Sequence, residues 1–323
     1  MNSMQRPLKT AFSPFSTAEE VSRGADLAGR MAIVTGGASG LGLETVRVLS
    51  ALGARVVVPA RNVASARKAL AGLRQVEVAE MDLIDPTSIH GFAADFLASG
   101  TPLDLLILNA GIMTPPLFRD KDGREGQFAT NHLGHFRLTA ALWPALKSAG
   151  RARVIVLSSR AHMMPGYELD DLDFIRRPYD KVAAYAQSKA ANALFSLGLD
   201  QRGQNHGIRS YAVHPGTVVG NLTKNASPEE LMTYGLINQD GTPLIDPIHD
   251  KKNFAQGAAT TVWCATAPEL TDIGGVYCEN SDIAQIEEQE FFGVRPYVID
   301  RDQADALWAR SVRLARIDLN NGQ

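Results

Sequence analysis

Two residues with complementary chemistry, Tyr185 and Lys189, are four positions apart in the stretch Tyr-Ala-Gln-Ser-Lys. If this stretch is helical, both side chains lie on one helix face. A positive charge beside a phenol favours the phenolate and lowers the phenol pKa, which suits a side chain that donates a proton to a carbonyl oxygen. Because the chain has seven tyrosines, such a pair also arises by chance, and its meaning depends on the elements around it.

A glycine-rich turn lies far upstream of this pair. The apolar run 32–34 is followed by Thr35 and by glycines at Gly36, Gly40 and Gly42. This pattern predicts a strand, a tight turn and the start of a helix. Glycine lets backbone N–H groups approach a phosphate, and a helix N-terminus presents the positive end of its dipole. The turn is suited to the diphosphate of a dinucleotide, although its spacing is not G-x-G-x-x-G; the alternative is an ordinary glycine-rich turn.

The elements that must position these residues alternate regularly. Short runs rich in Val, Ile and Leu predict strands at 31–35, 55–60, 75–80, 103–108, 153–157, 208–213 and 275–278. Amphipathic segments predict helices at 41–52, 64–73, 86–98, 126–147, 181–202 and 255–265. The fold class this predicts is α/β, a Rossmann-type doubly wound parallel sheet of seven strands with helices on both faces. Ligands of such sheets bind at the carboxyl ends of the strands.

The ends of the chain and two long connections depart from this alternation. We divide the chain into an arm with a short helix over 1–28 and a single domain over 29–323. Residues 1–14 predict a loose arm, and a capping box at 16–19 predicts a helix that ends near residue 24. Connections near 162–180 and 220–252 are inserted loops of the kind that often form lids. We assign no function to the last forty residues, which end in a predicted helix near 302–314.

The composition excludes several classes of partner. A net charge of -3 provides no basic field, which argues against nucleic acid and against an anionic membrane surface, and leaves a small molecule as the expected partner. We find no apolar stretch of membrane-spanning length and no secretory signal. Cys264 and Cys278 form neither a CxxC motif nor a metal cluster with histidine, so we expect no metal site. These observations predict a reducing compartment, the cytoplasm.

The turn from Thr35 to Gly42 resembles the T-G-x-x-x-G-x-G turn of the short-chain dehydrogenase/reductase family. Other segments resemble the motifs of that family in the expected order. The segments Thr-Asn-His-Leu-Gly-His-Phe at 130–136, Ser-Ser-Arg-Ala-His at 158–162 and Gln-Ser-Lys-Ala-Ala-Asn at 187–192 are most similar to the retinol dehydrogenase and WW-domain oxidoreductase group. The resemblance covers about residues 15–283 and implies hydride transfer with a nicotinamide dinucleotide.

The resemblance also implies four catalytic residues. Tyr185 acts as the proton donor, and Lys189 lowers its pKa and binds the nicotinamide ribose. Ser159 polarises the reacting oxygen. Asn131 disturbs a helix and holds a water that connects the lysine to solvent.

Several neighbouring polar residues have alternative interpretations. Ser158 is the alternative to Ser159, and both serines could simply end a strand. Asp82 could cap the helix that begins at Pro86. We interpret His132 and His135, beside Asn131, as packing or surface residues.

The implied cofactor contacts come from the glycine turn and from the carboxyl ends of later strands: Gly36, Ser39, Gly40, Leu41, Gly42, Asp82, Leu83, Asn109, Ala110, Gly111, Tyr185, Lys189, Pro215, Gly216 and Val218. Arg61 follows the second strand and favours NADP(H), because an arginine pairs with a 2′-phosphate whereas a carboxylate binds the ribose 2′-OH. NAD(H) stays open. The family's threonine after Pro-Gly is Gly220 here, so we expect a backbone contact near Val218, with Thr223 as a possible substitute.

The sequence thus predicts an NADP(H)-dependent oxidoreductase that moves a hydride between the nicotinamide and a carbonyl or secondary alcohol. Met113, Met163, Met164, Tyr167 and the segment 220–252 would line a pocket for a bulky apolar substrate. One alternative is a non-catalytic dinucleotide-binding sensor or scaffold. Another is an epimerase or dehydratase on the same fold. The resemblance implies a homo-oligomer, a dimer or tetramer paired through the helix that contains Tyr185, although some members are monomeric.

Overall fold

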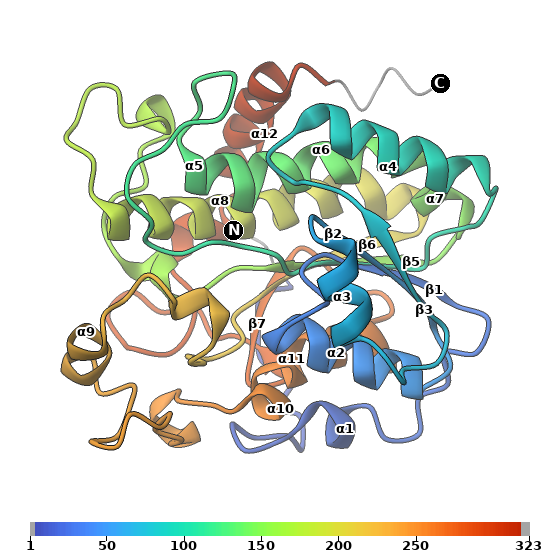
Figure 1. Ribbon diagram of the computed structural model, residues 1–323, viewed down its shortest axis with the longest axis horizontal. Coiled ribbons are helices and arrows are strands. Elements are labelled where there is room, and N and C mark those ends of the chain that lie inside the picture. The colour runs from blue at the N-terminus through green and yellow to red at the C-terminus, as the bar shows by residue number, and fades with distance from the viewer. Residues whose placement is uncertain (1–3, 318–323) are drawn as a thin grey trace.

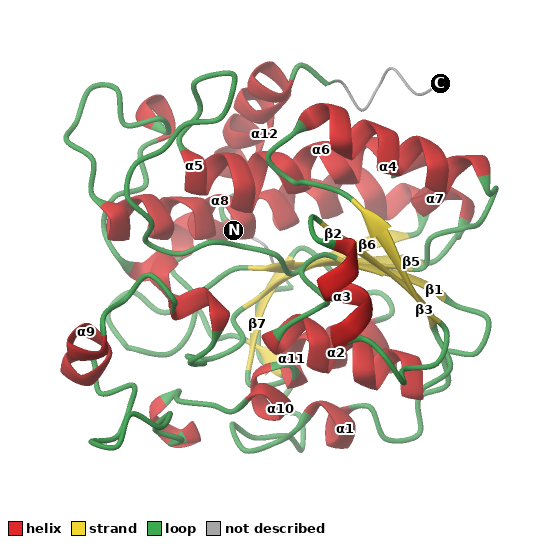
Figure 2. Ribbon diagram, viewed as in Figure 1, coloured by secondary structure: helices red, strands yellow, loops and turns green. Residues whose placement is uncertain are grey.

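Apolar strands form a sheet at the centre of the molecule, between two layers of helices (Figures 1 and 2). The computed structural model describes residues 4–317, and within them the sheet has eight strands in the order β3-β2-β1-β4-β5-β6-β7-β8. The strands are β1 (Met31–Val34), β2 (Arg55–Ala60), β3 (Val76–Glu80), β4 (Leu105–Leu108), β5 (Ala152–Leu157), β6 (Ile208–Val213), β7 (Val276–Glu279) and β8 (Asp282–Ile283). Strands β1 to β7 pair in parallel, which confirms the predicted fold class.

The predicted count of seven strands is wrong by one. Strand β8 pairs antiparallel with the end of β7. The chain reverses between them because Asn280 and Ser281 both adopt left-handed backbone angles, with φ of 51° and 58°. A strand of two residues is too short to show an alternating pattern in the sequence.

Helices cover both faces of the sheet. One layer contains α4 (Pro86–Ala98), α6 (Gly134–Ala141), α7 (Trp143–Ser148) and α8 (Lys181–Gly203); the other contains α2 (Gly40–Ala51), α3 (Val63–Ala69), α10 (Phe254–Gly257) and α11 (Ala259–Thr266) (Figure 1). The smaller helices are α1 (Ala18–Val21), α5 (Gly126–Phe128) and α9 (Pro228–Thr233). Side chains at Asn62, Asp85 and Asp180 accept backbone N–H groups and so begin α3, α4 and α8.

The predicted helix over 126–147 is interrupted. It consists of α5, a π-helix over Ala129–Leu133, α6 and α7. The π-helix adds one residue to a turn and has Asn131 at its centre. Pro144 stands in the first turn of α7, where the lack of an N–H donor is tolerated.

The N-terminal arm is fastened to the sheet, which corrects the expectation that it is loose. The Gln5 side chain donates to the carbonyls of Tyr277 and Ala284 and accepts the N–H of Tyr277. The Asp282 carboxylate accepts the N–H groups of three consecutive arm residues, 8–10. The arm therefore satisfies polar backbone groups at the β7–β8 edge. The capping box also lies one residue later than predicted, with Thr17 and Glu20 as its partners.

The C-terminal helix α12 (Arg301–Ala315) confirms the helix predicted near 302–314. It packs over α6 and α8. The Trp308 ring stacks on Phe195 of α8 with centroids 5.9 Å apart, and its centroid lies 5.0 Å from that of Phe136 of α6. The outer face of α8 is covered in this way, and its residues from Ala184 to Asp200 are buried.

Candidate active site

The glycine turn between β1 and α2 provides a cradle for an anion. Ser39 begins α2 without a side-chain capping bond, and the first turn of the helix has no acidic residue. A Cβ atom added at Gly42 would lie 2.3 Å from the carbonyl oxygen of Gly36, so no larger residue fits there. Gly40 has a φ of 54°. An uncapped helix N-terminus behind closely packed glycines fits the diphosphate of a dinucleotide.

The turn is joined to the end of β4. The hydroxyl oxygen of Thr35 accepts the backbone N–H groups of Asn109 and Ala110 at 2.9 and 3.0 Å. The Asn109 amide donates to the Thr35 carbonyl at 2.8 Å. These bonds hold the predicted Asn-Ala-Gly segment beside the glycine turn, at the carboxyl edge of the sheet.

Asn131 is fully buried and is bound on both sides. Its side-chain oxygen accepts the N–H of Ile112 at 2.8 Å, and its amide donates to the Ile112 carbonyl and to the Ser188 hydroxyl at 3.0 and 2.9 Å. The side chain therefore connects the π-helix, the segment after β4 and α8. A Cβ at Gly111 would lie 3.2 Å from the Asn131 side-chain oxygen and 3.6 Å from the Lys189 Nζ, which places these three residues together.

Ser159 and Tyr185 also lie together. The Ser159 Oγ accepts the N–H of Ala161 at 3.1 Å, which leaves the hydroxyl proton available for donation. Burial raises the pKa of Tyr185 to about 12, and a hydrogen bond with the Ser159 side chain acts in the opposite direction. The phenol is therefore protonated at neutral pH. The predicted lowering of the Tyr185 pKa is wrong for this structure, because the removal of water from a phenolate outweighs the interactions that favour it.

Lys189 projects from the same face of α8. Its Nζ donates to the carbonyl of Leu157 at 3.0 Å and lies 5.7 Å from the centre of the Tyr185 ring. Burial lowers the pKa of Lys189 to about 8. The helical spacing predicted from the sequence thus places a buried ammonium group beside a buried phenol.

Several alternatives are decided by hydrogen bonds. The Ser158 hydroxyl donates to the Lys189 carbonyl at 2.8 Å, so it is turned toward the backbone of α8. The residue that caps α4 is Asp85, while Asp82 accepts the N–H of Ile84. The Thr223 hydroxyl donates to the carbonyl of Gly220 at 2.8 Å and closes a short helical turn.

The remaining cofactor candidates lie along the same sheet edge. Leu83 follows Asp82 and is buried, and its carbonyl approaches Gly134 so closely that a Cβ there would lie 2.3 Å from it. Arg61 is exposed one residue past β2, and among residues 4–317 its side chain has no ion-pair partner. Pro215 and Gly216 follow β6, with Gly216 at a φ of 88°.

A buried ion cluster begins at Arg160, beside Ser159, and its residues are not among those predicted from the sequence. Arg160, next to Ser159, donates to Asp250 through Nε and one terminal nitrogen at 3.2 and 3.1 Å, and to Glu279 at 3.0 Å. His214 Nε2 lies 2.9 Å from Asp250, and Thr217 donates to the same carboxylate at 3.1 Å. The cluster ties together the ends of β5, β6 and β7 and the end of the 220–252 loop. Arg160 and Asp250 are 90 positions apart in the chain, so no local sequence pattern predicts their pairing.

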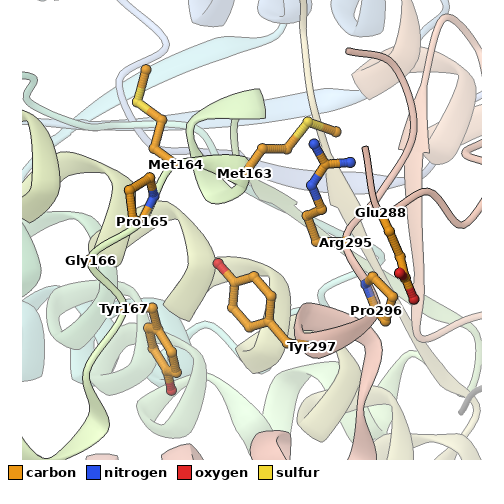
Figure 3. Close-up of a pocket in the computed structure, with 9 residues that line it drawn as sticks. All are labelled: Met163, Met164, Pro165, Gly166, Tyr167, Glu288, Arg295, Pro296 and Tyr297. Carbon is orange, nitrogen blue, oxygen red and sulfur yellow. The ribbon is translucent and has the colours of Figure 1, made fainter. Parts of the chain in front are cut away.

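A cavity of about 540 Å³ lies between the segment 163–167 and the C-terminal segment 288–297 (Figure 3). It is lined by Met163, Met164, Pro165, Gly166, Tyr167, Glu288, Arg295, Pro296 and Tyr297. Three predicted residues line it, but Met113 and the 220–252 segment do not. The opposite wall comes from the C-terminal part of the chain, to which no function was assigned from the sequence. The N–H of Arg295 donates to His162 Nε2 at 3.2 Å, which ties this wall to the segment after Ser159.

Comparisons with known proteins agree with this fold. The family model for short chain dehydrogenases matches residues 30–171. A "Probable oxidoreductase" of Streptomyces antibioticus is 41% identical over 293 residues, which cover 88% of this chain and 96% of that protein. Retinol dehydrogenase 12 of Mus musculus is 39% identical over 77% of each chain. The WW domain-containing oxidoreductase of Pongo abelii is 36% identical over 93% of this chain and 71% of that protein.

A solved structure of an uncharacterised protein from Mycobacterium paratuberculosis superposes with a TM-score of 0.71 and 31% identity, covering 93% of this chain and 98% of that one. The chain belongs to the short-chain dehydrogenase/reductase family, and it is similar to the retinol dehydrogenase and WW-domain oxidoreductase group. It is an oxidoreductase that acts on CH–OH or C=O groups with a nicotinamide dinucleotide. Among residues 4–317, no helix combines the length and apolar character needed to cross a membrane.

Proposed function

We propose that this enzyme reduces the carbonyl group of a bulky apolar substrate with NADPH, and that Tyr185 donates the proton. The observation that carries the proposal is the placement of Tyr185 beside Ser159 at the carboxyl edge of the sheet. The bound dinucleotide supplies the hydride. Ser159 directs its hydroxyl proton at the carbonyl oxygen and stabilises the charge that develops there.

Tyr185 is suited to donate the proton because burial raises its pKa to about 12, so the phenol holds its proton at working pH. Lys189 stabilises the phenolate that remains after donation, since its Nζ lies 5.7 Å from the ring centre. Asn131 holds the segment after β4 in place by its pair of bonds to Ile112. We propose that Asn131 supports the proton path from Lys189 to solvent.

The preference for NADPH rests on Arg61. Its exposed side chain follows β2, at the strand end where the adenosine ribose of a dinucleotide is bound in doubly wound folds. A guanidinium at this place pairs with a 2′-phosphate. The remaining contacts would come from the glycine turn, from Asp82 and Asn109, and from the backbone near Val218.

The apolar substrate class rests on the cavity between the segment 163–167, which follows Ser159 in the chain, and the segment 288–297. Its wall is formed mainly by methionine, proline and tyrosine side chains, and its volume of about 540 Å³ is in the range of small-molecule sites. A Cβ at Gly166 would lie 3.0 Å from Ala183, two residues before Tyr185, so this wall adjoins the catalytic helix. Arg295 and Glu288 supply the charged groups of the lining.

The test is the variant Tyr185→Phe, assayed for ketone reduction by the loss of NADPH absorbance. General acids contribute about 10²- to 10⁴-fold, so we expect kcat to fall by about that factor while NADPH affinity is unchanged. Reduction by the variant at the parent rate would disprove the role of Tyr185. A parent enzyme that binds NADPH but turns over none of a broad carbonyl panel would instead favour a sensor or scaffold.

The assembly and location are also proposals. We propose that any homo-oligomer uses a surface other than α8, because α12 covers the outer face of that helix. The cytoplasm remains the proposed location, and the two cysteines, which are free and buried thiols, are consistent with a reducing compartment.

A further inference from the structure

The ring of Phe254 lies between the two segments that flank the diphosphate cradle. Its Cε1 atom is 3.4 Å from the position that a Cβ of Gly40 would occupy, and 3.1 Å from the corresponding position at Gly220. Gly40 is the first residue of α2, and Gly220 lies in the loop after β6. The side chain is 40% exposed although it is large and apolar. It therefore bridges the mouth of the cradle rather than filling the core.

The short helix α10, which begins at Phe254, is held firmly in this place. Its capping box uses the side chains of Asn253 and Gln256. At its other end, a Cβ on Gly257 would lie 2.6 Å from Leu41 and 2.8 Å from Val218, so the helix packs directly between the glycine turn and the loop after β6. Figure 1 shows α10 beside α2 on the same face of the sheet.

This placement explains why residue 220 is glycine. Its backbone φ of -180° is extended, a conformation that any residue adopts, so no backbone constraint requires glycine. The constraint is space, because a Cβ would lie 3.0 Å from the Phe254 Cζ. A threonine, which the family pattern places here, would require the ring to move.

We propose that Phe254 is an aromatic cover for the diphosphate of the bound dinucleotide and that it replaces the threonine contact at position 220. The ring turns its edge atoms Cε1 and Cζ toward the glycines. An aromatic edge carries partial positive charge, which favours a neighbouring anion. The ring also excludes water from the N-terminus of α2, where the lower dielectric strengthens hydrogen bonds from backbone N–H groups to phosphate oxygens.

The proposal deepens the proposed function, on which it rests for the site of dinucleotide binding. The test is a double-mutant cycle of Phe254→Ala, Gly220→Thr and the two together, measured by calorimetric binding of NADPH and of NADH to the full-length protein. Thermal unfolding of each apo variant shows that it is folded. Tyr234→Ala removes an aromatic residue that is 65% exposed on the neighbouring loop and is the matched control.

We expect the Kd of Phe254→Ala for NADPH to rise about tenfold, which corresponds to about 1.4 kcal/mol, with faster dissociation. Gly220→Thr alone is expected to weaken binding because the threonine and the ring compete for one space. The double variant is expected to bind more tightly than either single variant, because the threonine hydroxyl then occupies the vacated space. Tyr234→Ala should bind like the parent.

Phe254→Ala with a Kd within twofold of the parent, or single effects that add in the double variant, would overturn the proposal. In both cases the parent still binds the dinucleotide and turns over, so the proposed function stands. A parent that binds neither dinucleotide would overturn both. Ketone reduction by Tyr185→Phe at the parent rate, together with the expected results of the double-mutant cycle, would overturn only the proposed function.

Discussion

The imidazole Nδ1 of His135 lies 2.9 Å from the carbonyl oxygen of Asn131, four residues earlier in the chain. A carbonyl can only accept, so Nδ1 carries the hydrogen and Nε2 accepts from the Thr35 hydroxyl at 2.9 Å. Burial lowers the pKa of His135 to about 4, so the ring is neutral in this role. The ring links the π-helix around Asn131 to the strand that ends in the glycine turn, and the interpretation of His135 as a packing residue was incomplete.

Removal of this link should destabilise the fold. His135→Ala leaves a cavity and deprives the Asn131 carbonyl and the Thr35 hydroxyl of a partner, so we expect the free energy of unfolding to fall by about 2–4 kcal/mol. Urea denaturation followed by circular dichroism measures it. His90→Ala on the exposed side of α4 is the control and should change stability by less than about 0.5 kcal/mol. Equal midpoints for the two variants would contradict a linking role for His135.

Lys189 should set the alkaline limit of ketone reduction. Burial lowers its pKa to about 8, so the ammonium is present below that pH and is lost above it. We expect kcat/KM to be level at pH 6–7 and to fall about tenfold per pH unit well above pH 8. Lys189→Arg stays charged and should work more slowly but without this decline. A variant that keeps the same decline would assign it to another group.

Arg61 should determine the choice between the two dinucleotides. We expect Arg61→Asp to raise the Kd for NADPH by about 30-fold, the equivalent of about 2 kcal/mol, with no loss for NADH. Arg67→Asp makes the same charge change at an exposed position of α3. It controls for the change in the overall electrostatic field of the protein. Calorimetry with both dinucleotides measures the effect. A similar loss in both variants would show that Arg61 contributes only through overall charge.

Asp250 should hold the base of the 220–252 loop. Burial acts to raise the pKa of this carboxyl, but the neighbouring His214 and Arg160 outweigh burial and keep it well below its usual range. Asp250→Asn removes the charge that Arg160 needs in the interior, so we expect a loss of about 3–5 kcal/mol in unfolding free energy. Cleavage of the loop by a protease should also become faster.

The control for Asp250 is Asp246→Asn on the same loop. Its partner His249 is an exposed histidine at 2.6 Å, and exposed pairs contribute about 0–1 kcal/mol. If Asp250 anchors the loop, Asp250→Asn must lose clearly more unfolding free energy than Asp246→Asn. If both tolerate the change equally well, the buried cluster does not anchor the loop.

Local sequence patterns predicted much of the fold. The sequence predicted the strand at Met31–Val34, the glycine turn after it and the shared helix face of Tyr185 and Lys189. These features were predictable because burial, backbone freedom and helical periodicity act on neighbouring residues. The alternation of strands and helices along the chain was predicted in the same way. Local patterns failed where an element was too short, as at Asp282–Ile283, and the disturbance of the helix at Asn131 was predicted only from the family resemblance.

The sequence by itself determined the fold class and the family, and it predicted candidate site residues that lie at the carboxyl edge of the sheet. Only the tertiary structure decided that Gln5 binds the backbone of β7, that residues of the segment 288–297 line the cavity, and that Arg160 pairs with Asp250. It also decided that the ring of Phe254 occupies the space beside Gly220. These contacts join residues far apart in the chain, and each depends on how whole elements pack. The periodicity or residue spacing within one segment does not indicate where another segment packs against it.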